Sequence, residues 1–216
     1  MRPKQTGPHQ GQPLLREGTK LDKARAAVLM LHGRGSSAED ILTLIPQFQI
    51  PGFAFVAPQA AGGTWYPNSF LVPLVRNEPY LSSALQAVDA ALEHLEAHAI
   101  PPEYVILMGF SQGACLALEF AARNARKFGG IAGLSGGLIG DDQTPRDYPG
   151  SFANTPVFLG CSDVDPHVPK ARVELSAEVF QRMDADVTMR LFPGMAHTIN
   201  EDEVRAVRAM MAALVK

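Results

Sequence analysis

YVILMGFSQGACLALEF, residues 104–120, is the stretch of sequence that decides the fold. Tyr104–Met108 is continuously apolar, as is typical of a strand buried on both faces, and the residues after the turn have the composition of a helix. The turn has the pattern GxSxG, in which the residues two before and two after the serine must be small to avoid a collision. Gly109 and Gly113 meet that requirement. The segment therefore predicts a sharp strand-to-helix turn with Ser111 as a candidate nucleophile at a helix N-terminus, where the helix dipole favours developing negative charge.

Apolar runs of the same kind recur along the chain and alternate with amphipathic segments. The other runs are Ala26–Leu31, Phe53–Pro58, Gly130–Leu134, Pro156–Gly160 and Val187–Phe192. Helical periodicity marks the segments 36–48, 81–98, 171–183 and 200–214, the first with a capping-box pattern at Ser36 and Glu39. This alternation predicts an α/β fold with a mostly parallel central sheet, helices on both faces and no large lid domain. Sites in such sheets collect at the carboxyl ends of the strands.

Length and composition set further limits on the class of protein. The 216 residues fit a single domain, 1–216, which begins with a polar N-terminal arm at 1–23. The net charge is −3 and no basic run is present, so we expect no nucleic-acid partner. The N-terminal segment lacks the apolar core of a secretion signal, and no apolar run is long enough to span a bilayer. We therefore expect a cytoplasmic monomer or homodimer without stable membrane insertion that acts on a small-molecule substrate.

The cysteines and histidines show no metal-binding pattern. Cys115 and Cys161 lie in apolar runs and are expected to be buried, reduced thiols. No CxxC or Cys/His spacing typical of a zinc site is present. His94 and His98 are four residues apart on a helix, but Glu96 is not at the position that the HExxH motif requires. We expect neither a metal nor another cofactor.

The loop after the first apolar run is a candidate oxyanion hole. It reads LHGRGS at residues 31–36, and its glycines allow the backbone to approach a bound substrate closely. An acyl-transfer site needs two backbone N–H groups directed at the developing oxyanion. We assign them to Arg34 and to Gln112, the residue after the candidate nucleophile. A tight strand-to-helix connection without further role is the alternative. The Arg34 side chain either points into the cleft, where it would attract an acidic substrate, or lies over the surface.

A base and an acid are expected downstream of Ser111. The last apolar run leads into PGMAH at 193–197, which places His197 in a short loop before the final helix, where a base that reaches Ser111 belongs. The acid lies in the segment 161–169, and by position Asp163 and Asp165 both qualify. His167 is too close in sequence to either aspartate to complete a triad, and is expected to line the loop or to be solvated.

The segment GTWYPNSFL at 63–71 is rich in large apolar side chains and lacks helical periodicity. It is either a flap over an acyl pocket or a loop whose Trp65 and Phe70 side chains hold it down. On the first interpretation Trp65, Phe70 and Arg34 are candidate substrate-binding residues.

Taken together, the motifs resemble those of the phospholipase/carboxylesterase family, which includes the acyl-protein thioesterases. The matching pieces are LHGRG at 31–35, GFSQG at 109–113, D-x-x-V-P at 165–169 and GMAH at 194–197. They follow the family's order and span nearly the whole chain. The resemblance implies an α/β-hydrolase fold, a Ser-Asp-His triad and no metal. It also implies that Asp165, which opens the D-x-x-V-P segment, is the acid, and that the oxyanion donors match Arg34 and Gln112.

The expected function is that of a serine carboxylic ester hydrolase. Short to medium acyl esters would react through an acyl-Ser111 intermediate, and thioesters are a further candidate class of substrate. One alternative is a lactonase similar to dienelactone hydrolase, although such enzymes commonly carry cysteine at the position of Ser111. Another is a non-catalytic binding protein that has kept the fold, although the complete set of triad and oxyanion residues argues against it.

Overall fold

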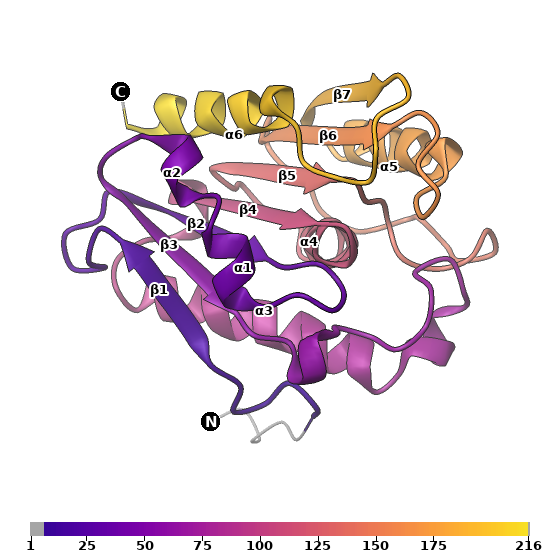
Figure 1. Ribbon diagram of the computed structural model, residues 1–216, viewed down its shortest axis with the longest axis horizontal. Helices are drawn as coiled ribbons and strands as arrows, with labels where there is room; N and C mark the ends of the chain where they lie inside the picture. The colour runs from indigo at the N-terminus through magenta and orange to yellow at the C-terminus, as the bar shows by residue number, and fades with distance from the viewer. Residues whose placement is uncertain (1–6, 216) are drawn as a thin grey trace.

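The computed structural model describes residues 7–215, and its centre is a twisted sheet of seven strands in the order β1-β3-β2-β4-β5-β6-β7 (Figure 1). The strands are β1 (Leu14–Gly18), β2 (Ala26–Leu31), β3 (Phe53–Pro58), β4 (Val105–Phe110), β5 (Gly130–Leu134), β6 (Pro156–Ser162) and β7 (Asp186–Phe192). All neighbouring strands run parallel except β1, which pairs antiparallel with β3. The predicted mostly parallel sheet is confirmed.

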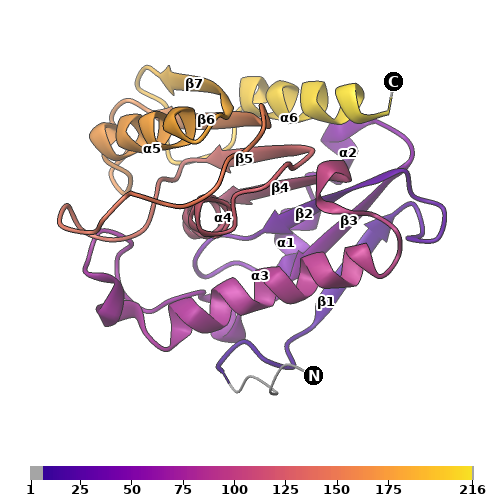
Figure 2. The same cartoon turned by 180° about the vertical axis from the view of Figure 1, so that it is seen from behind.

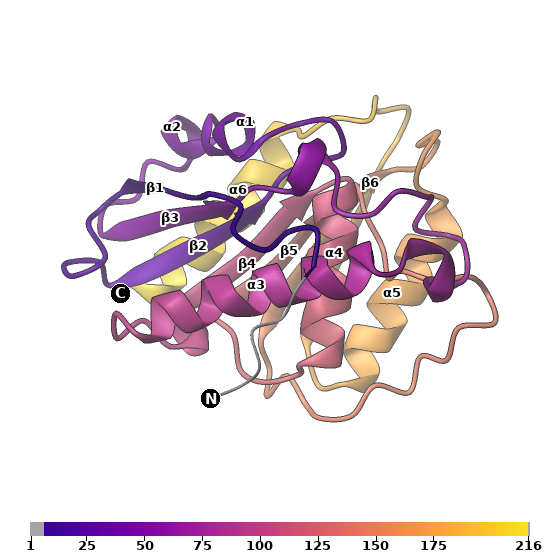
Figure 3. The same ribbon diagram turned by 90° about the horizontal axis from the view of Figure 1, so that it is seen from below.

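Helices cover both faces of the sheet and make three layers, as Figures 2 and 3 show from behind and from below. One face carries α1 (Ala38–Leu42), α2 (Ile45–Phe48) and α6 (Glu201–Leu214), and the other carries α3 (Tyr80–Glu96), α4 (Gln112–Arg123) and α5 (Lys170–Arg182). Short 3₁₀ turns lie at Ala61–Gly63, Leu74–Asn77 and Pro102–Tyr104. No large lid domain covers the sheet in the part of the chain that the structure describes.

The double covering explains why the central strands are continuously apolar. Consecutive residues of a strand point to opposite faces, so Leu107 and Met108 of β4 enter two different cores. Leu107 packs in the core beneath α3, α4 and α5, and Met108 packs in the core beneath α1, α2 and α6. The edge strand β7 is less covered, and Asp186 and Met189 on it are exposed.

The expected polar N-terminal arm at 1–23 needs a correction. Residues 14–18 form strand β1 at the edge of the sheet, with Leu14 opposite Pro58 and Gly18 opposite Ala54. The segment LLREG is a weak strand signal, because it combines two apolar residues with two charged residues and a glycine. Residues 1–6 of the arm lie outside the described residues.

The predicted single helix over 36–48 is also wrong in detail. The N-cap residue is Ser37, whose Oγ accepts a hydrogen bond from Asp40 N at 3.2 Å, whereas Ser36 Oγ donates to the Asp40 carboxylate. The helix divides into α1 and α2 before Pro46, because proline has no N–H with which to continue the helical hydrogen bonds.

Helix α6 begins with a capping box and places a buried carboxyl under the sheet. Asn200 Oδ1 accepts from Glu203 N at 3.0 Å, and Glu203 Oε2 accepts from Asn200 N at 2.9 Å. The Glu203 side chain packs against Gly160 of β6, where a Cβ would collide with the carboxyl group. Its Oε1 has no hydrogen-bond partner among the described residues. Burial raises the pKa of Glu203 to about 7, although the hydrogen bond from Asn200 opposes the shift.

No helix within residues 7–215 combines the length and the apolar character needed to cross a membrane.

The raised pKa of Glu203 predicts a pH-dependent stability difference between the wild type and Glu203→Gln. The folded state binds the Glu203 proton more tightly than the unfolded state, so this stabilisation is complete below the ordinary pKa of 4.5 and is lost as the pH rises to about 7. The free energy of unfolding of Glu203→Gln should therefore rise relative to wild type across this range, by up to about 3 kcal/mol. Urea denaturation from pH 4.5 to 8 measures the difference, and parallel profiles would contradict it.

Candidate active site

The turn after β4 holds Ser111 in a strained backbone conformation at the start of α4. Its φ and ψ angles are 54° and −118°. A residue with a side chain in this region of backbone conformation is destabilised by about 1–3 kcal/mol. The conformation is held from both sides, because Ser111 N donates to Leu134 O of β5 at 2.9 Å and Cys115 N donates to Ser111 O at 3.0 Å. The conformation held in this way places the Ser111 hydroxyl at the carboxyl edge of the sheet.

The two glycines of the turn are required by the close approach of backbone to backbone. A Cβ on Gly113 would collide with the carbonyl groups of Leu31 and His32 at the end of β2. A Cβ on Gly109 would collide with the peptide of Gly113 itself. The first turn of α4 consequently lies directly against the loop that follows β2, which brings this loop beside Ser111.

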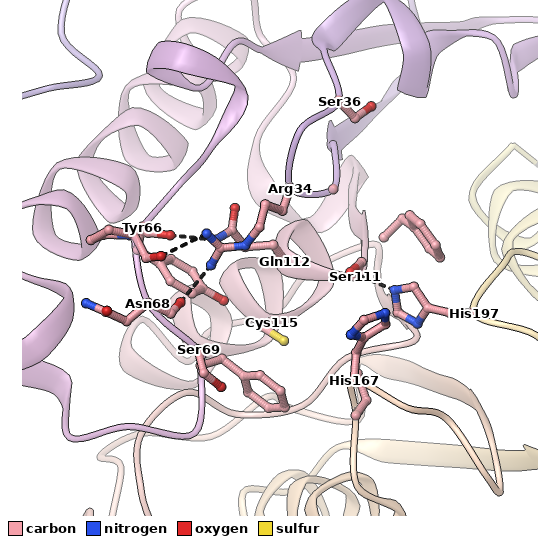
Figure 4. Close-up of a pocket in the computed structure, with 15 residues that line it drawn as sticks. Arg34, Ser36, Tyr66, Asn68, Ser69, Ser111, Gln112, Cys115, His167 and His197 are labelled. Carbon is pink, nitrogen blue, oxygen red and sulfur yellow. Dashed lines mark hydrogen bonds between the residues drawn. The ribbon is translucent and has the colours of Figure 1, made fainter.

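Ser111, His197 and Asp165 form a continuous hydrogen-bonded chain, part of which Figure 4 shows. His197 Nε2 lies 2.8 Å from Ser111 Oγ, and His197 Nδ1 lies 2.7 Å from Asp165 Oδ2. In a neutral imidazole the proton then resides on Nδ1 and donates to the carboxylate, which leaves the Nε2 lone pair to accept from the serine hydroxyl. The His197 side chain is 17% exposed and that of Asp165 is fully buried.

The geometry distinguishes Asp165 from Asp163, whereas their positions in the sequence leave both as candidates for the acid. Asp165 Oδ1 accepts from the N–H groups of His167 at 2.8 Å and Val168 at 3.0 Å, while its Oδ2 faces His197. Burial favours the neutral carboxyl, but the bonds from His197 and from these two N–H groups outweigh it and lower the pKa of Asp165. Asp163 instead accepts from Gly194 N at 2.8 Å and holds the loop that leads to His197.

The direction of the Arg34 N–H is set by the carbonyl group of Gly33, which belongs to the same peptide group and is held by His32. His32 Nε2 accepts from Ala60 N at 3.1 Å, so the ring proton is on Nδ1 and donates to Gly33 O at 2.8 Å. Burial lowers the pKa of His32, although the bond to Gly33 opposes the shift, and this favours the neutral ring. Since a trans peptide directs its C=O and N–H to opposite sides, holding Gly33 O turns the Arg34 N–H away from His32. Within residues 7–215 no hydrogen bond uses the N–H of Arg34 or of Gln112.

A pocket of about 520 Å³ opens beside Ser111. Its walls combine Ser111 and His197 with apolar side chains, among them Tyr66, Phe70, Phe110, Cys115 and Val168. Among the described residues that line it, none is acidic, and Arg34 is the one with a permanently charged side chain. Burial raises the pKa of Cys115 to about 12, so this residue faces the pocket as a thiol.

The three candidate substrate-binding residues have different positions. Phe70 and Arg34 line the pocket, but Trp65 does not. Trp65 is fully buried, and its indole N–H donates to His32 O at 2.9 Å, so its side chain packs the segment down instead of contacting a substrate. The Arg34 side chain is exposed, but its guanidinium is held against the pocket wall. It donates to the carbonyl groups of Pro67 at 2.9 Å and Asn68 at 2.6 Å.

Several residues of the site were not assigned to it from the sequence. His167 lines the pocket, and its ring stands edge-on to that of His197 with 4.9 Å between centroids. Tyr66 and Cys115 line the same pocket. The sequence indicated only that Tyr66 lies in a segment of large apolar side chains and that Cys115 is buried. No local pattern would have found His167 and Tyr66, because only the tertiary fold brings them beside Ser111, whereas Cys115 lies one turn of α4 after Ser111.

Neither His94, in the last turn of α3, nor His98, in the turn that follows the helix, lines this pocket. The two rings are 4.6 Å apart, and His94 Nε2 lies 3.4 Å from Arg16 Nη1. Within residues 7–215, no group of three or more His, Cys, Asp and Glu side chains is placed to hold a metal ion.

Comparison with known proteins agrees with this geometry. The family model described as Phospholipase/Carboxylesterase matches residues 18–215. The chain belongs to this family. The predicted resemblance is thus confirmed, and the α/β-hydrolase fold with it.

Relatives within the phospholipase/carboxylesterase family cover most of the chain. The acyl-protein thioesterase 1 of Saccharomyces cerevisiae is 29% identical over 213 residues, which cover 88% of this chain and 93% of the relative. The crystal structure of a phospholipase/carboxylesterase from Dyadobacter fermentans is 42% identical, with a TM-score of 0.89, and covers 95% of this chain and 97% of that one. The structure of esterase PE8 is 25% identical with a TM-score of 0.76.

The close approach at the elbow predicts a large loss of stability in Gly113→Ala. The added Cβ must displace the end of β2, at a cost of about 3 kcal/mol in the free energy of unfolding. Gly62→Ala is the matched control, since Gly62 has a φ of 60° but open space around it, and should cost about 1 kcal/mol. Urea denaturation compares the two variants, and an equal loss in both would disprove the steric explanation.

Proposed function

We propose that this protein is a serine hydrolase that cleaves carboxylic esters through an acyl-Ser111 intermediate. The observation that carries the proposal is the hydrogen-bonded chain from Ser111 through His197 to Asp165 at the mouth of a largely apolar pocket. The positions of the three groups match the nucleophile, base and orienting acid of an acyl-transfer site.

In the first half of the reaction Ser111 Oγ adds to the ester carbonyl carbon and its proton moves to His197 Nε2. The carbonyl π electrons move to oxygen, which becomes the oxyanion. Asp165 stabilises the imidazolium that forms and keeps its Nδ1–H directed at the carboxylate. The tetrahedral intermediate then collapses, the bond to the leaving oxygen or sulfur breaks, and His197 Nε2–H protonates the leaving group.

In the second half a water molecule replaces the leaving group. His197 takes its proton, the hydroxide adds to the acyl carbon, and the bond to Ser111 Oγ breaks as the proton returns to the serine. The oxyanion of both steps would accept hydrogen bonds from the backbone N–H groups of Arg34 and Gln112. Loss of one such donor typically costs about 3–4 kcal/mol of transition-state stabilisation.

The pocket favours short to medium acyl chains. Its volume is about 520 Å³, and the rings of Tyr66, Phe70 and Phe110 provide apolar walls. Thioesters are a further candidate substrate class, because several relatives are acyl-protein thioesterases. A thiolate is also a better leaving group than an alkoxide, so the same residues suffice for both.

Substitution of the triad tests the proposal. Ser111→Ala should lower kcat for p-nitrophenyl butyrate by about 10⁶-fold and Asp165→Ala by about 10⁴-fold, since the first removes the nucleophile and the second the orienting acid. Asp163→Ala is the matched control from the same loop and should retain far more activity, because Asp163 contacts Gly194 N and not His197. Covalent labelling of Ser111 by a fluorophosphonate provides a second readout. An unlabelled wild type would identify a binding protein.

Acyl-chain length tests the substrate range. Across p-nitrophenyl esters from acetate to palmitate, kcat/KM should be highest for short to medium chains and fall for palmitate, because the pocket measures about 520 Å³ and Phe70 occupies part of its wall. Phe70→Ala should move the optimum to longer chains by enlarging the pocket. Parallel assays with S-acyl analogues and with lactones compare the three ester classes, and a clear lactone preference would replace the proposed substrate.

A further inference from the structure

The backbone of residues 65–68, here called the wall strip, contacts the side chains of both proposed oxyanion donors. Trp65 N donates to Gln112 Oε1 at 2.9 Å, and Gln112 Nε2 donates to Tyr66 O at 2.8 Å. The next two carbonyl groups along the strip accept from Arg34, at 2.9 Å for Pro67 and 2.6 Å for Asn68. Figure 4 shows the two side chains converging on this segment from opposite elements.

We propose that the wall strip aligns the oxyanion hole, with the side chains of Arg34 and Gln112 as positioning residues for their own backbone N–H groups. The inference rests on the proposed hydrolase function and adds a role that the triad does not supply. Each of these two residues would act twice, with the N–H directed at the oxyanion and the side chain fixed to one common strip.

The Arg34 loop has the greater need for such an anchor. Arg34 is exposed and lies between two glycines, and Gly35 has a φ of 74° in open space, so local sterics leave the peptide groups of this loop free to rotate. His32 fixes the peptide before Arg34 through Gly33 O. The guanidinium and the bond from Gly35 N to Gly63 O at 2.8 Å fix the residue from the other side.

Gln112 differs because α4 already orders its backbone. Gln112 is 6% exposed, and its side-chain amide accepts one hydrogen bond from the strip and donates one to it. Loss of either bond would leave a buried polar group without a partner, which is unfavourable. The side chain therefore fixes the spacing between the start of α4 and the strip.

The strip is itself anchored on its far side, so it provides a fixed reference. Asn77 is fully buried; its Oδ1 accepts from Asn68 N at 2.9 Å and its Nδ2 donates to Ser69 O at 3.0 Å. His9 Nδ1 accepts from Ala61 N, so its Nε2–H donates to Trp65 O at 2.9 Å. The segment 63–71, for which the sequence left a flap and a packed-down loop as alternatives, thus forms a wall whose backbone is hydrogen-bonded to Asn77 and to His9.

Methionine substitutions test the alignment. Arg34→Met and Gln112→Met keep the backbone N–H groups and much of the side-chain volume but remove the four contacts to the strip. For p-nitrophenyl butyrate we expect kcat to fall about tenfold in each variant with little change in KM, as a partial loss of an oxyanion donor requires. Affinity for an alkyl trifluoromethyl ketone, whose adduct with Ser111 carries an oxyanion, should fall in parallel. Arg34→Lys, which retains one donor group, should recover part of the loss.

Phe70→Leu is the control for pocket shape, because Phe70 lines the same wall without holding either donor, and its effect should appear in KM. Unchanged kcat and inhibitor affinity in both methionine variants would overturn the inference while wild-type activity upholds the proposed function. A rise in KM of Arg34→Met confined to a p-nitrophenyl hemisuccinate would also overturn it and assign the guanidinium to substrate binding. A wild type that neither hydrolyses the butyrate nor reacts with a fluorophosphonate would defeat the proposed function and the inference together.

Discussion

The arrangement of the site depends on the contact between the first turn of α4 and the end of β2. Gly113 lies so close to the carbonyl groups of Leu31 and His32 that no side chain fits between them. This approach holds Ser111 at a positive φ and places it beside the loop that carries Arg34. A wider gap between helix and strand would separate the serine from this loop, so the glycine makes one turn and one loop into a single site.

The hydrogen bonds of the site orient its polar groups and favour one protonation state of Asp165 and one tautomer of His32. Asp165 accepts bonds on both oxygens, and its lowered pKa keeps it anionic opposite His197 Nδ1. His32 is held as the Nδ1–H tautomer by the N–H of Ala60, which fixes the peptide of Gly33. Pre-organisation of this kind is effective because the groups need no rearrangement when charge develops in the transition state.

The wall strip connects this ordered centre to the substrate pocket. Residues that shape the pocket wall are bonded through their backbone to Gln112 and Arg34, while their far side is bonded to Asn77 and His9. The N-terminal segment that contains His9 therefore supports the site from behind, a role that its polar composition did not suggest. On the proposed function, specificity and catalysis would be linked here, because the same peptide groups form the pocket wall and anchor the loop that carries Arg34.

The sequence by itself determined the features that depend on local periodicity and backbone sterics. The buried strands, the main helices, the elbow at Ser111 and the loop positions of Arg34 and His197 all follow from apolar runs and glycine spacing. Residue spacing left Asp163 and Asp165 equivalent, and resemblance to a family was needed to prefer the second. Only the tertiary structure decided that Trp65 is buried, that Arg34 binds the wall strip and that residues 14–18 complete the sheet. Each of these depends on partners 33 or more residues away, between Trp65 and His32, Arg34 and Asn68, or Leu14 and Pro58. Such contacts are fixed by how the layers pack, and a local pattern carries no information about them.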